Sequence, residues 1–292
     1  MALLKQNIPL ETYFTTYATS YDGPTSRLLD GDCSCLNPQS DSHRCCYRSL
    51  RRTHKMGSVM TRSLFNEYEP PIRKVWAPET FNYTEGRPAT DYRDVLVIRN
   101  IFDSIVSGYL FHSEGQECDK TTPDGQTVIK RNGRWYLRHW EHYVKYELDP
   151  PANGRTMCRY MADESEDIGM HAYIDFVFNY HYSRGMLSHW GLSQGIPEVG
   201  DRTMTVCYED LMSPERDVAT MNRMLDFWYN GSSTSGNHEP YAGIAPGHVN
   251  YSGGHSTTHD PVVRERLKEI AKRVDLEYYS GEIAWADSVL PC

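Results

Sequence analysis

The stretch Val95-Leu-Val-Ile98-Arg99-Asn-Ile-Phe-Asp-Ser-Ile-Val-Ser107-Gly-Tyr109 decides the fold. Its first four residues are all apolar, which is typical of a buried parallel strand. After Arg99 the apolar residues return at helical spacing, at Ile101, Ile105, Val106, Tyr109 and Leu110. The stretch therefore predicts a strand, a turn and an amphipathic helix.

Arg99 stands in the predicted turn, and Ser107 lies about two turns into the predicted helix. A guanidinium and a hydroxyl suit a phosphate monoester, because the phosphate accepts two parallel hydrogen bonds from the planar guanidinium. We therefore predict that Arg99 and Ser107 form a phosphate clamp. The alternative for an arginine after a strand is a surface position or a structural ion pair, and a second motif favours the clamp.

That second motif is Lys55-Met-Gly57-Ser-Val-Met-Thr61, where a first helix is predicted over residues 58–68. A glycine turn lets the backbone approach an anion closely, and the free amides of a helix start favour negative charge. Lys55, Ser58 and Thr61 add donors at the same place. The motif predicts a phosphate loop. Its order differs from that of a nucleoside-triphosphate loop, in which the lysine follows the last glycine.

The two motifs together resemble those of the sulfotransferases that use 3′-phosphoadenosine 5′-phosphosulfate (PAPS). The first motif is Lys-x-Gly-Ser, which begins at Lys55, and the second is Arg-Asn-x-x-Asp-x-x-x-Ser-x-Tyr, which begins at Arg99. A third segment, residues 203–211 with Tyr208-Glu-Asp-Leu211 at its end, is similar to the late strand and turn of that family. The likeness extends over residues 53–275 and is interrupted in the middle. It implies an α/β fold with a doubly wound, mainly parallel sheet flanked by helices, as in P-loop proteins.

The resemblance implies a role for each motif in binding PAPS. The residues that would hold the 5′-phosphosulfate are Lys55, Met56, Gly57, Ser58, Val59, Met60 and Thr61. Arg99 and Ser107 would hold the 3′-phosphate. Gly254 and His255 would occupy the place of the family's late basic motif and touch the same phosphate, the alternative being a flexible turn.

Sulfuryl transfer, like phosphoryl transfer, depends mainly on positioning and charge stabilisation. By resemblance, Lys55 would neutralise charge on the leaving phosphate, and no metal is required. Lumenal carbohydrate and tyrosine sulfotransferases use a glutamate as general base after the strand that follows the first helix, and Glu79 matches that place. Glu67, Glu85 or a histidine remain alternatives; a lone histidine such as His112 is more often structural.

The expected activity is transfer of a sulfuryl group from PAPS to a hydroxyl or amine, leaving adenosine 3′,5′-bisphosphate (PAP). The acceptor class stays open between carbohydrate, protein and small molecule. Two other classes stay open as well. A nucleotide-dependent small-molecule kinase would also need a phosphate loop, and a non-catalytic protein could bind PAP or PAPS without turnover.

Composition fits this class. The chain has 292 residues, of which 39% are apolar and 24% charged, enough for one α/β domain with insertions. Its net charge of −9 argues against nucleic acid as a partner. It lacks the long apolar run of a membrane-spanning helix. Whether the chain forms a homodimer stays open.

Cysteines and glycosylation triplets bear on the compartment. The eight cysteines could form disulfides in an oxidising lumen, ligate a metal or remain free thiols. Three glycosylation triplets begin at Asn82, Asn230 and Asn250. These features favour the Golgi or another secretory lumen, and the cytoplasm stays open.

We predict an extended arm over residues 1–44 and one sulfotransferase domain over residues 45–292, with an insertion near 113–133. Residues 45–52 are more polar than a central strand usually is, which predicts a short or shifted first strand. A strand is expected at 72–76, and helices at 135–148 and 171–190. The aromatic residues of the second helix, from Tyr173 to Tyr182, favour a core role over an acceptor pocket. A last helix should start at Pro261, with Val262, Val263, Leu267, Ile270 and Val274 on its apolar side.

Overall fold

The computed structural model describes residues 46–52, 73–76, 91–114, 119–121, 127–129, 155–178, 187–195, 200–213, 215–229 and 260–292. These residues form a mixed α/β structure with a parallel sheet, as predicted. The chain divides into two compact units. The first takes residues up to Arg99, residues 181–251 and Cys292, and the second takes residues 100–180 and 252–291. The arm predicted over residues 1–44 lies outside the described residues, and the predicted domain bounds stay predictions.

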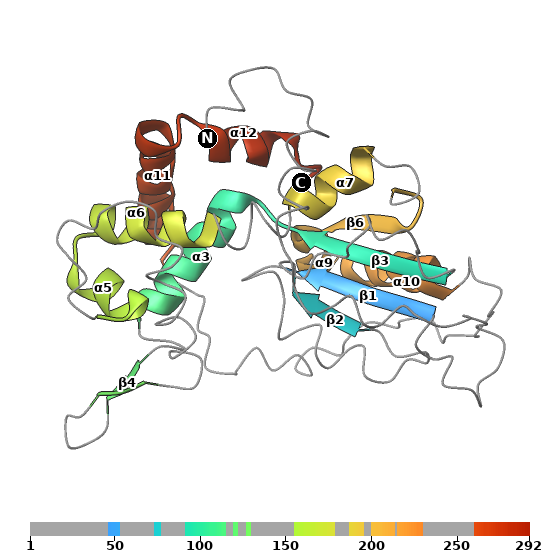
Figure 1. Ribbon diagram of the computed structural model, residues 1–292, viewed down its shortest axis with the longest axis horizontal. Coiled ribbons are helices and arrows are strands. Elements are labelled where there is room, and N and C mark those ends of the chain that lie inside the picture. The colour runs from blue at the N-terminus through green and yellow to red at the C-terminus, as the bar shows by residue number, and fades with distance from the viewer. Residues whose placement is uncertain are drawn as a thin grey trace, which may run out of the picture. The chain divides into compact units, whose positions relative to one another are not determined.

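The first unit contains a four-stranded sheet in the order β2-β1-β3-β6 (Figure 1). Its strands are β1 (Cys46–Arg52), β2 (Arg73–Trp76), β3 (Asp91–Ile98) and β6 (Thr203–Cys207), and all neighbours pair in parallel. The apolar run of β3 is fully buried from Val95 to Ile98. The prediction of a buried parallel strand there is confirmed, as are the strands expected at 72–76 and from residue 203.

The first strand differs from its prediction. β1 is seven residues long and pairs with both β2 and β3, so the expectation of a short or shifted strand is wrong. Backbone hydrogen bonds on both edges support a strand whatever its side chains are. Leu50 is fully buried and lies in register with Val95, which is fully buried as well. Polar composition alone was therefore a poor guide to this strand.

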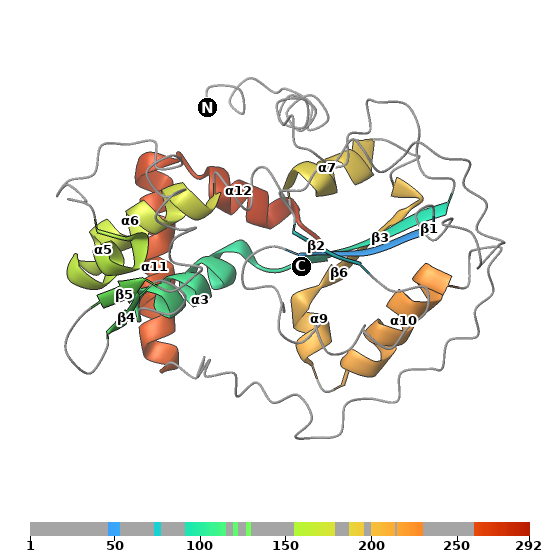
Figure 2. The same ribbon diagram turned by 60° about the horizontal axis from the view of Figure 1, so that its bottom comes forward.

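Helices lie on both sides of this sheet (Figure 2). On one side are α9 (Tyr208–Met212) and α10 (Asp217–Tyr229), and on the other is α7 (Ser188–Gly195). Met224, Leu225 and Trp228 of α10 are fully buried. Arg93 of β3 donates a 2.8 Å hydrogen bond to the carbonyl oxygen of Phe227, which attaches the end of α10 to the strand.

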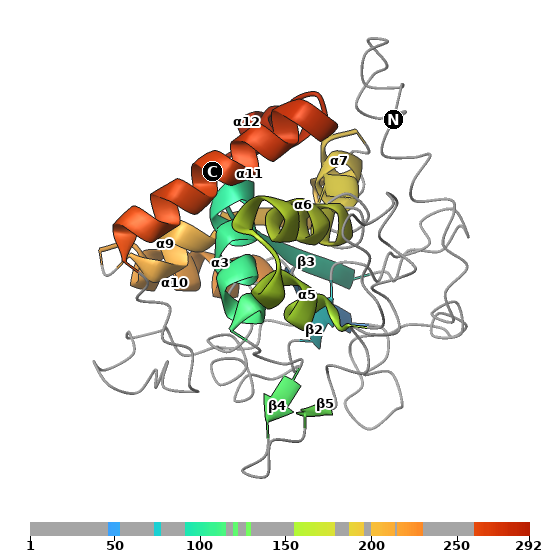
Figure 3. The same cartoon turned by 90° about the vertical axis from the view of Figure 1, so that its left-hand side faces the viewer.

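The second unit is built around α3 (Ile101–Ser113), which can be followed in Figure 3. α3 contacts α5 (Met157–Asp163), α6 (Glu166–Val177), α11 (Pro261–Tyr278) and α12 (Glu282–Val289). Ten of its residues besides Ile101 are buried, and only Asp103 and Ser113 are partly exposed. The helix is therefore confirmed, but it is buried on nearly every side instead of amphipathic, because helices cover it all round. The unit also holds an antiparallel pair, β4 (Asp119–Thr121) and β5 (Thr127–Ile129), within the predicted insertion.

Helix bounds are corrected in two places. The helix predicted over 171–190 is wrong, because α6 runs over 166–177 and α7 begins at Ser188. Tyr173, Phe176 and Phe178 are buried, in agreement with the core role. α11 begins at Pro261 after its cap Asp260, as predicted, but α12 follows it, and Val262 is 74% exposed. The helices predicted over 58–68 and 135–148 lie outside the described residues.

Within the described ranges, no helix combines the length and apolar character needed to cross a bilayer.

Candidate functional site

Arg99 and Tyr208 meet at the carboxyl edge of the sheet. The last ladder pair of β3 and β6 joins Ile98 to Cys207, so the next residue of each chain segment leaves the sheet at the same edge. The guanidinium carbon of Arg99 lies 4.7 Å from the centroid of the Tyr208 ring. A guanidinium over an aromatic face is attracted to its negative π surface. The end of the central strand and the end of its neighbour thus hold one cation between them.

Glu209 supplies the anion beside Arg99. Its Oε1 lies 3.8 Å from Arg99 Nε, and the Glu209 side chain is 42% exposed whereas that of Arg99 is 14% exposed. Burial raises the pKa of Tyr208, and Glu209 raises it further while Arg99 lowers it. The Tyr208 hydroxyl is consequently neutral near pH 7. The structural ion pair that sequence reasoning left open is therefore present, at a long distance and on a partly exposed carboxylate.

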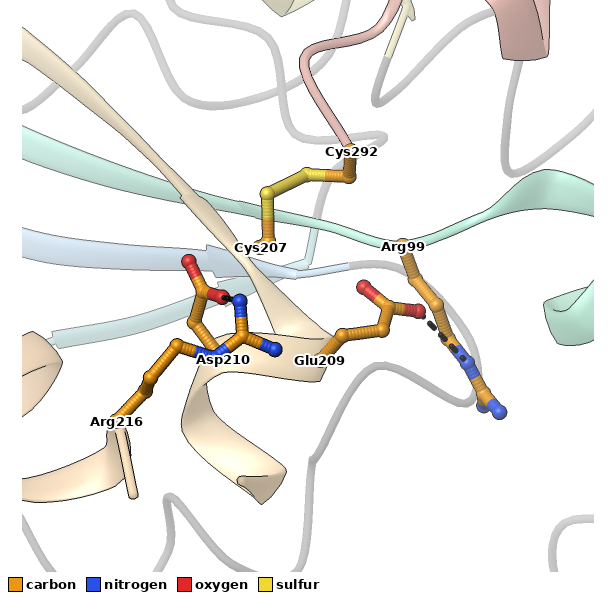
Figure 4. The surroundings of a disulfide bond; sticks show 6 residues. All are labelled: Arg99, Cys207, Glu209, Asp210, Arg216 and Cys292. Carbon is orange, nitrogen blue, oxygen red and sulfur yellow. Dashed lines mark ion pairs between the residues drawn. A yellow bond between two sulfur atoms is a disulfide. The ribbon is translucent and has the colours of Figure 1, made fainter. Parts of the chain in front are cut away.

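Two further features surround this cluster (Figure 4). Asp210 forms an ion pair with Arg216, with 2.6 Å between Oδ1 and Nη1, and the Arg216 side chain is 61% exposed. Cys207, the residue before Tyr208, forms a disulfide with Cys292. Figure 4 shows the disulfide and the Arg99–Glu209 pair near the end of β6. We call Arg99, Tyr208 and Glu209 the Arg99 cluster.

Ser107, the second residue of the predicted clamp, is on α3 and is 7% exposed. It belongs to the second unit, whereas Arg99 belongs to the first. The pairing of the two around one phosphate therefore stays a prediction.

The other polar residues of the Arg99 motif stabilise the start of α3. The Asn100 side chain accepts a 3.0 Å hydrogen bond from the Asp103 amide, which caps the helix. Asp287 of α12 accepts from Asn100 Nδ2 at 2.7 Å and from the Ile101 amide at 2.6 Å. Lys268 of α11 donates to Asp103 at 3.0 Å. Sequence reasoning missed Asp287, because nothing marked α12 as a helix, and it gave Glu209 no role of its own.

Most predicted site residues lie outside the described part of the chain. They are Lys55, Met56, Gly57, Ser58, Val59, Met60, Thr61, Glu79, Gly254 and His255, together with the alternative bases Glu67 and Glu85. His112 is described and fully buried, with Nδ1 3.7 Å from Sγ of the disulfide-bonded Cys158. That position suits a structural histidine.

Comparison with protein-family models, curated proteins and solved structures finds no match to this chain. The residues and the described geometry therefore carry the functional inference.

Proposed function

We propose that the chain is a PAPS-dependent sulfotransferase that transfers a sulfuryl group to a hydroxyl or amine of a carbohydrate, protein or small-molecule acceptor. One observation carries the proposal: Arg99 directly follows an inner strand of a parallel sheet and lies over Tyr208 at the carboxyl edge. In open α/β sheets, ligands bind at the carboxyl ends of the strands. The proposal includes the doubly wound sulfotransferase architecture, which the parallel order and the helices on both sides support.

The residues at this edge fit an anion. The Glu209 carboxylate already lies beside Arg99 Nε, so the surroundings of the guanidinium accept negative charge. A phosphate carries more charge than a carboxylate and can accept two parallel hydrogen bonds from a guanidinium. The long distance and partial exposure of the pair make Glu209 a weakly held partner, since water screens exposed ion pairs. We propose that a 3′-phosphate displaces the Glu209 carboxylate from Arg99.

The remaining roles follow from the resemblance. Lys55 and the 5′ loop would hold the phosphosulfate, Ser107 would add a hydroxyl to the 3′ clamp, and Glu79 would take the acceptor proton. PAPS supplies the sulfuryl group and PAP leaves. The Cys207–Cys292 disulfide supports the secretory lumen as compartment, because disulfides persist where the surroundings are oxidising.

Calorimetric titration with PAP, and separately with ATP and Mg²⁺, tests the proposal. We expect PAP to bind without metal and Arg99→Ala to weaken it about 10- to 100-fold, the loss typical of a hydrogen bond to a charged group. Arg216→Ala is the matched control, since Arg216 also follows β6 and pairs with an acid but is largely exposed. It should bind PAP like the wild type.

Three results would contradict the proposal: no PAP binding, equal loss in both variants, or a preference for ATP with Mg²⁺, which would favour the kinase. PAP affinity without turnover on an acceptor panel supplied with PAPS would favour the non-catalytic protein.

A further inference from the structure

The three described disulfide-bonded cysteines differ sharply in accessibility. Cys158 is 1% exposed, so solvent thiols cannot reach its sulfur without local opening. Cys292 is exposed and its partner Cys207 is partly exposed. Thiol–disulfide exchange requires a thiolate to approach one sulfur directly, so access decides which bond is attacked. Cys292 is consequently the most accessible of these three cysteines.

This bond lies at the residue that precedes the Arg99 cluster. Cys207 ends β6 and forms the last ladder pair with Ile98. Tyr208 and Glu209 then begin α9, and Arg99 directly follows β3. Among the described strands, β6 is at the edge of the sheet and pairs only with β3. Cys207 is therefore the last residue that the described ladder holds against β3. The disulfide adds a covalent restraint at that end.

We infer that Cys207–Cys292 is a redox modification site, acted on by a dithiol reductant, and that its opening loosens the Arg99 cluster and weakens nucleotide binding. The effect on nucleotide rests on the proposed function, whereas the loosening does not. When the bond opens, the end of β6 can separate from Ile98 and carry Tyr208 and Glu209 away from Arg99. Arg99 then loses the ring that orients its guanidinium.

The chemistry balances as a two-electron exchange. A reductant thiolate attacks the sulfur of the exposed residue Cys292, the S–S bond breaks, and Cys207 leaves as a thiolate. The second thiol of the reductant then attacks the mixed disulfide, which releases Cys292 and closes the reductant's own disulfide. The two cysteine thiolates take up protons, so the dithiol is oxidised and the protein is reduced.

Graded reduction of the full chain with dithiothreitol tests the inference. Alkylation followed by mass spectrometry identifies which cysteines are released, and amide hydrogen exchange is measured across residues 203–212. PAP affinity is measured in the same samples. We expect Cys207 and Cys292 to be released while Cys158 stays bridged, exchange to rise about tenfold, and the PAP dissociation constant to rise about tenfold. Cys292→Ser should show the loosened state without reductant and no further change with it.

The outcomes are separable. Release of Cys158 at the same dithiothreitol concentration, or unchanged exchange after Cys207 is released, overturns the inference whether or not PAP binds. Faster hydrogen exchange with unchanged PAP affinity overturns the inference that opening of the disulfide weakens nucleotide binding. If the oxidised wild type does not bind PAP, the proposed function fails, and the alkylation and exchange data still decide the redox site. If Cys292→Ser does not fold, the reduced wild type supplies the same comparison.

Discussion

Gly108 provides a sharp test of the packing at the Ser107-Gly108-Tyr109 motif. A Cβ atom added at Gly108 would lie 1.9 Å from the Tyr173 hydroxyl oxygen and 2.9 Å from its Cζ. Tyr173 is 1% exposed, so its ring cannot swing into solvent. Overpacking of a core costs about 1–3 kcal/mol, and a contact of 1.9 Å places this site at about 2–3 kcal/mol. Alanine recovers about 1 kcal/mol of helix propensity relative to glycine. We therefore expect Gly108→Ala to lower the free energy of unfolding by about 1–2 kcal/mol.

Urea denaturation followed by circular dichroism measures this change, and Tyr173→Phe identifies its cause. Removing the hydroxyl removes the 1.9 Å contact, so the double variant should recover about 1 kcal/mol of the loss. Gly281→Ala is the matched control: nothing lies within 4 Å of its added Cβ, but its φ of +79° disfavours alanine. Its cost of about 1 kcal/mol should be independent of Tyr173→Phe. A Gly108→Ala protein as stable as the wild type, or a loss that Tyr173→Phe leaves unchanged, would refute this packing argument.

Three other variants test the polar and covalent contacts. Burial raises the pKa of Asp275, so the folded state binds this proton more tightly than the unfolded state, and the stability that the group contributes is lost as pH rises through the raised pKa. In urea denaturation between pH 4 and 7, the stability of the wild type relative to Asp275→Asn should therefore increase as pH falls. A difference that stays constant with pH would contradict the burial argument. Asp287→Ala removes the acceptor of two hydrogen bonds at the start of α3 and should cost about 1–3 kcal/mol in the same assay; an unchanged midpoint would show that water replaces the carboxylate. Joint replacement of Cys207 and Cys292 by serine opens a loop of 85 residues, and loop entropy predicts that the free energy of unfolding falls by about 4–5 kcal/mol. Scanning calorimetry measures this change, and a loss of stability below about 1 kcal/mol would contradict the prediction.

The sequence predicted those parts of the fold in which one local signal dominates. The run from Val95 to Ile98 is apolar throughout, and its strand is confirmed. Pro261 follows the capping residue Asp260, and α11 begins there. By contrast, β1 is specified by the strands on its two sides, and no pattern within residues 46–52 carries that information.

The same difference between local and long-range signals decides which site residues can be predicted from the sequence. Arg99 stands out because an apolar strand delivers it to a turn, and the structure places it at the sheet edge. Its partner Glu209 is far along the chain, and only the alignment of β3 with β6 brings the two together. The disulfide was beyond sequence reasoning, since eight cysteines allow 105 pairings.

The order in which α3 and the helices that bury it are synthesised has a consequence for folding of the nascent polypeptide. α3 ends at Ser113, but α11 and α12, which contact it, begin at Pro261 and Glu282. At a synthesis rate of about 5–20 residues per second, roughly 10–30 s separate the emergence of α3 from that of the helices that cover it. During that interval the apolar residues of α3 in the nascent polypeptide are covered by only some of the helices that bury them in the folded protein. Chaperones that bind exposed apolar segments therefore have their clearest target in residues 101–112.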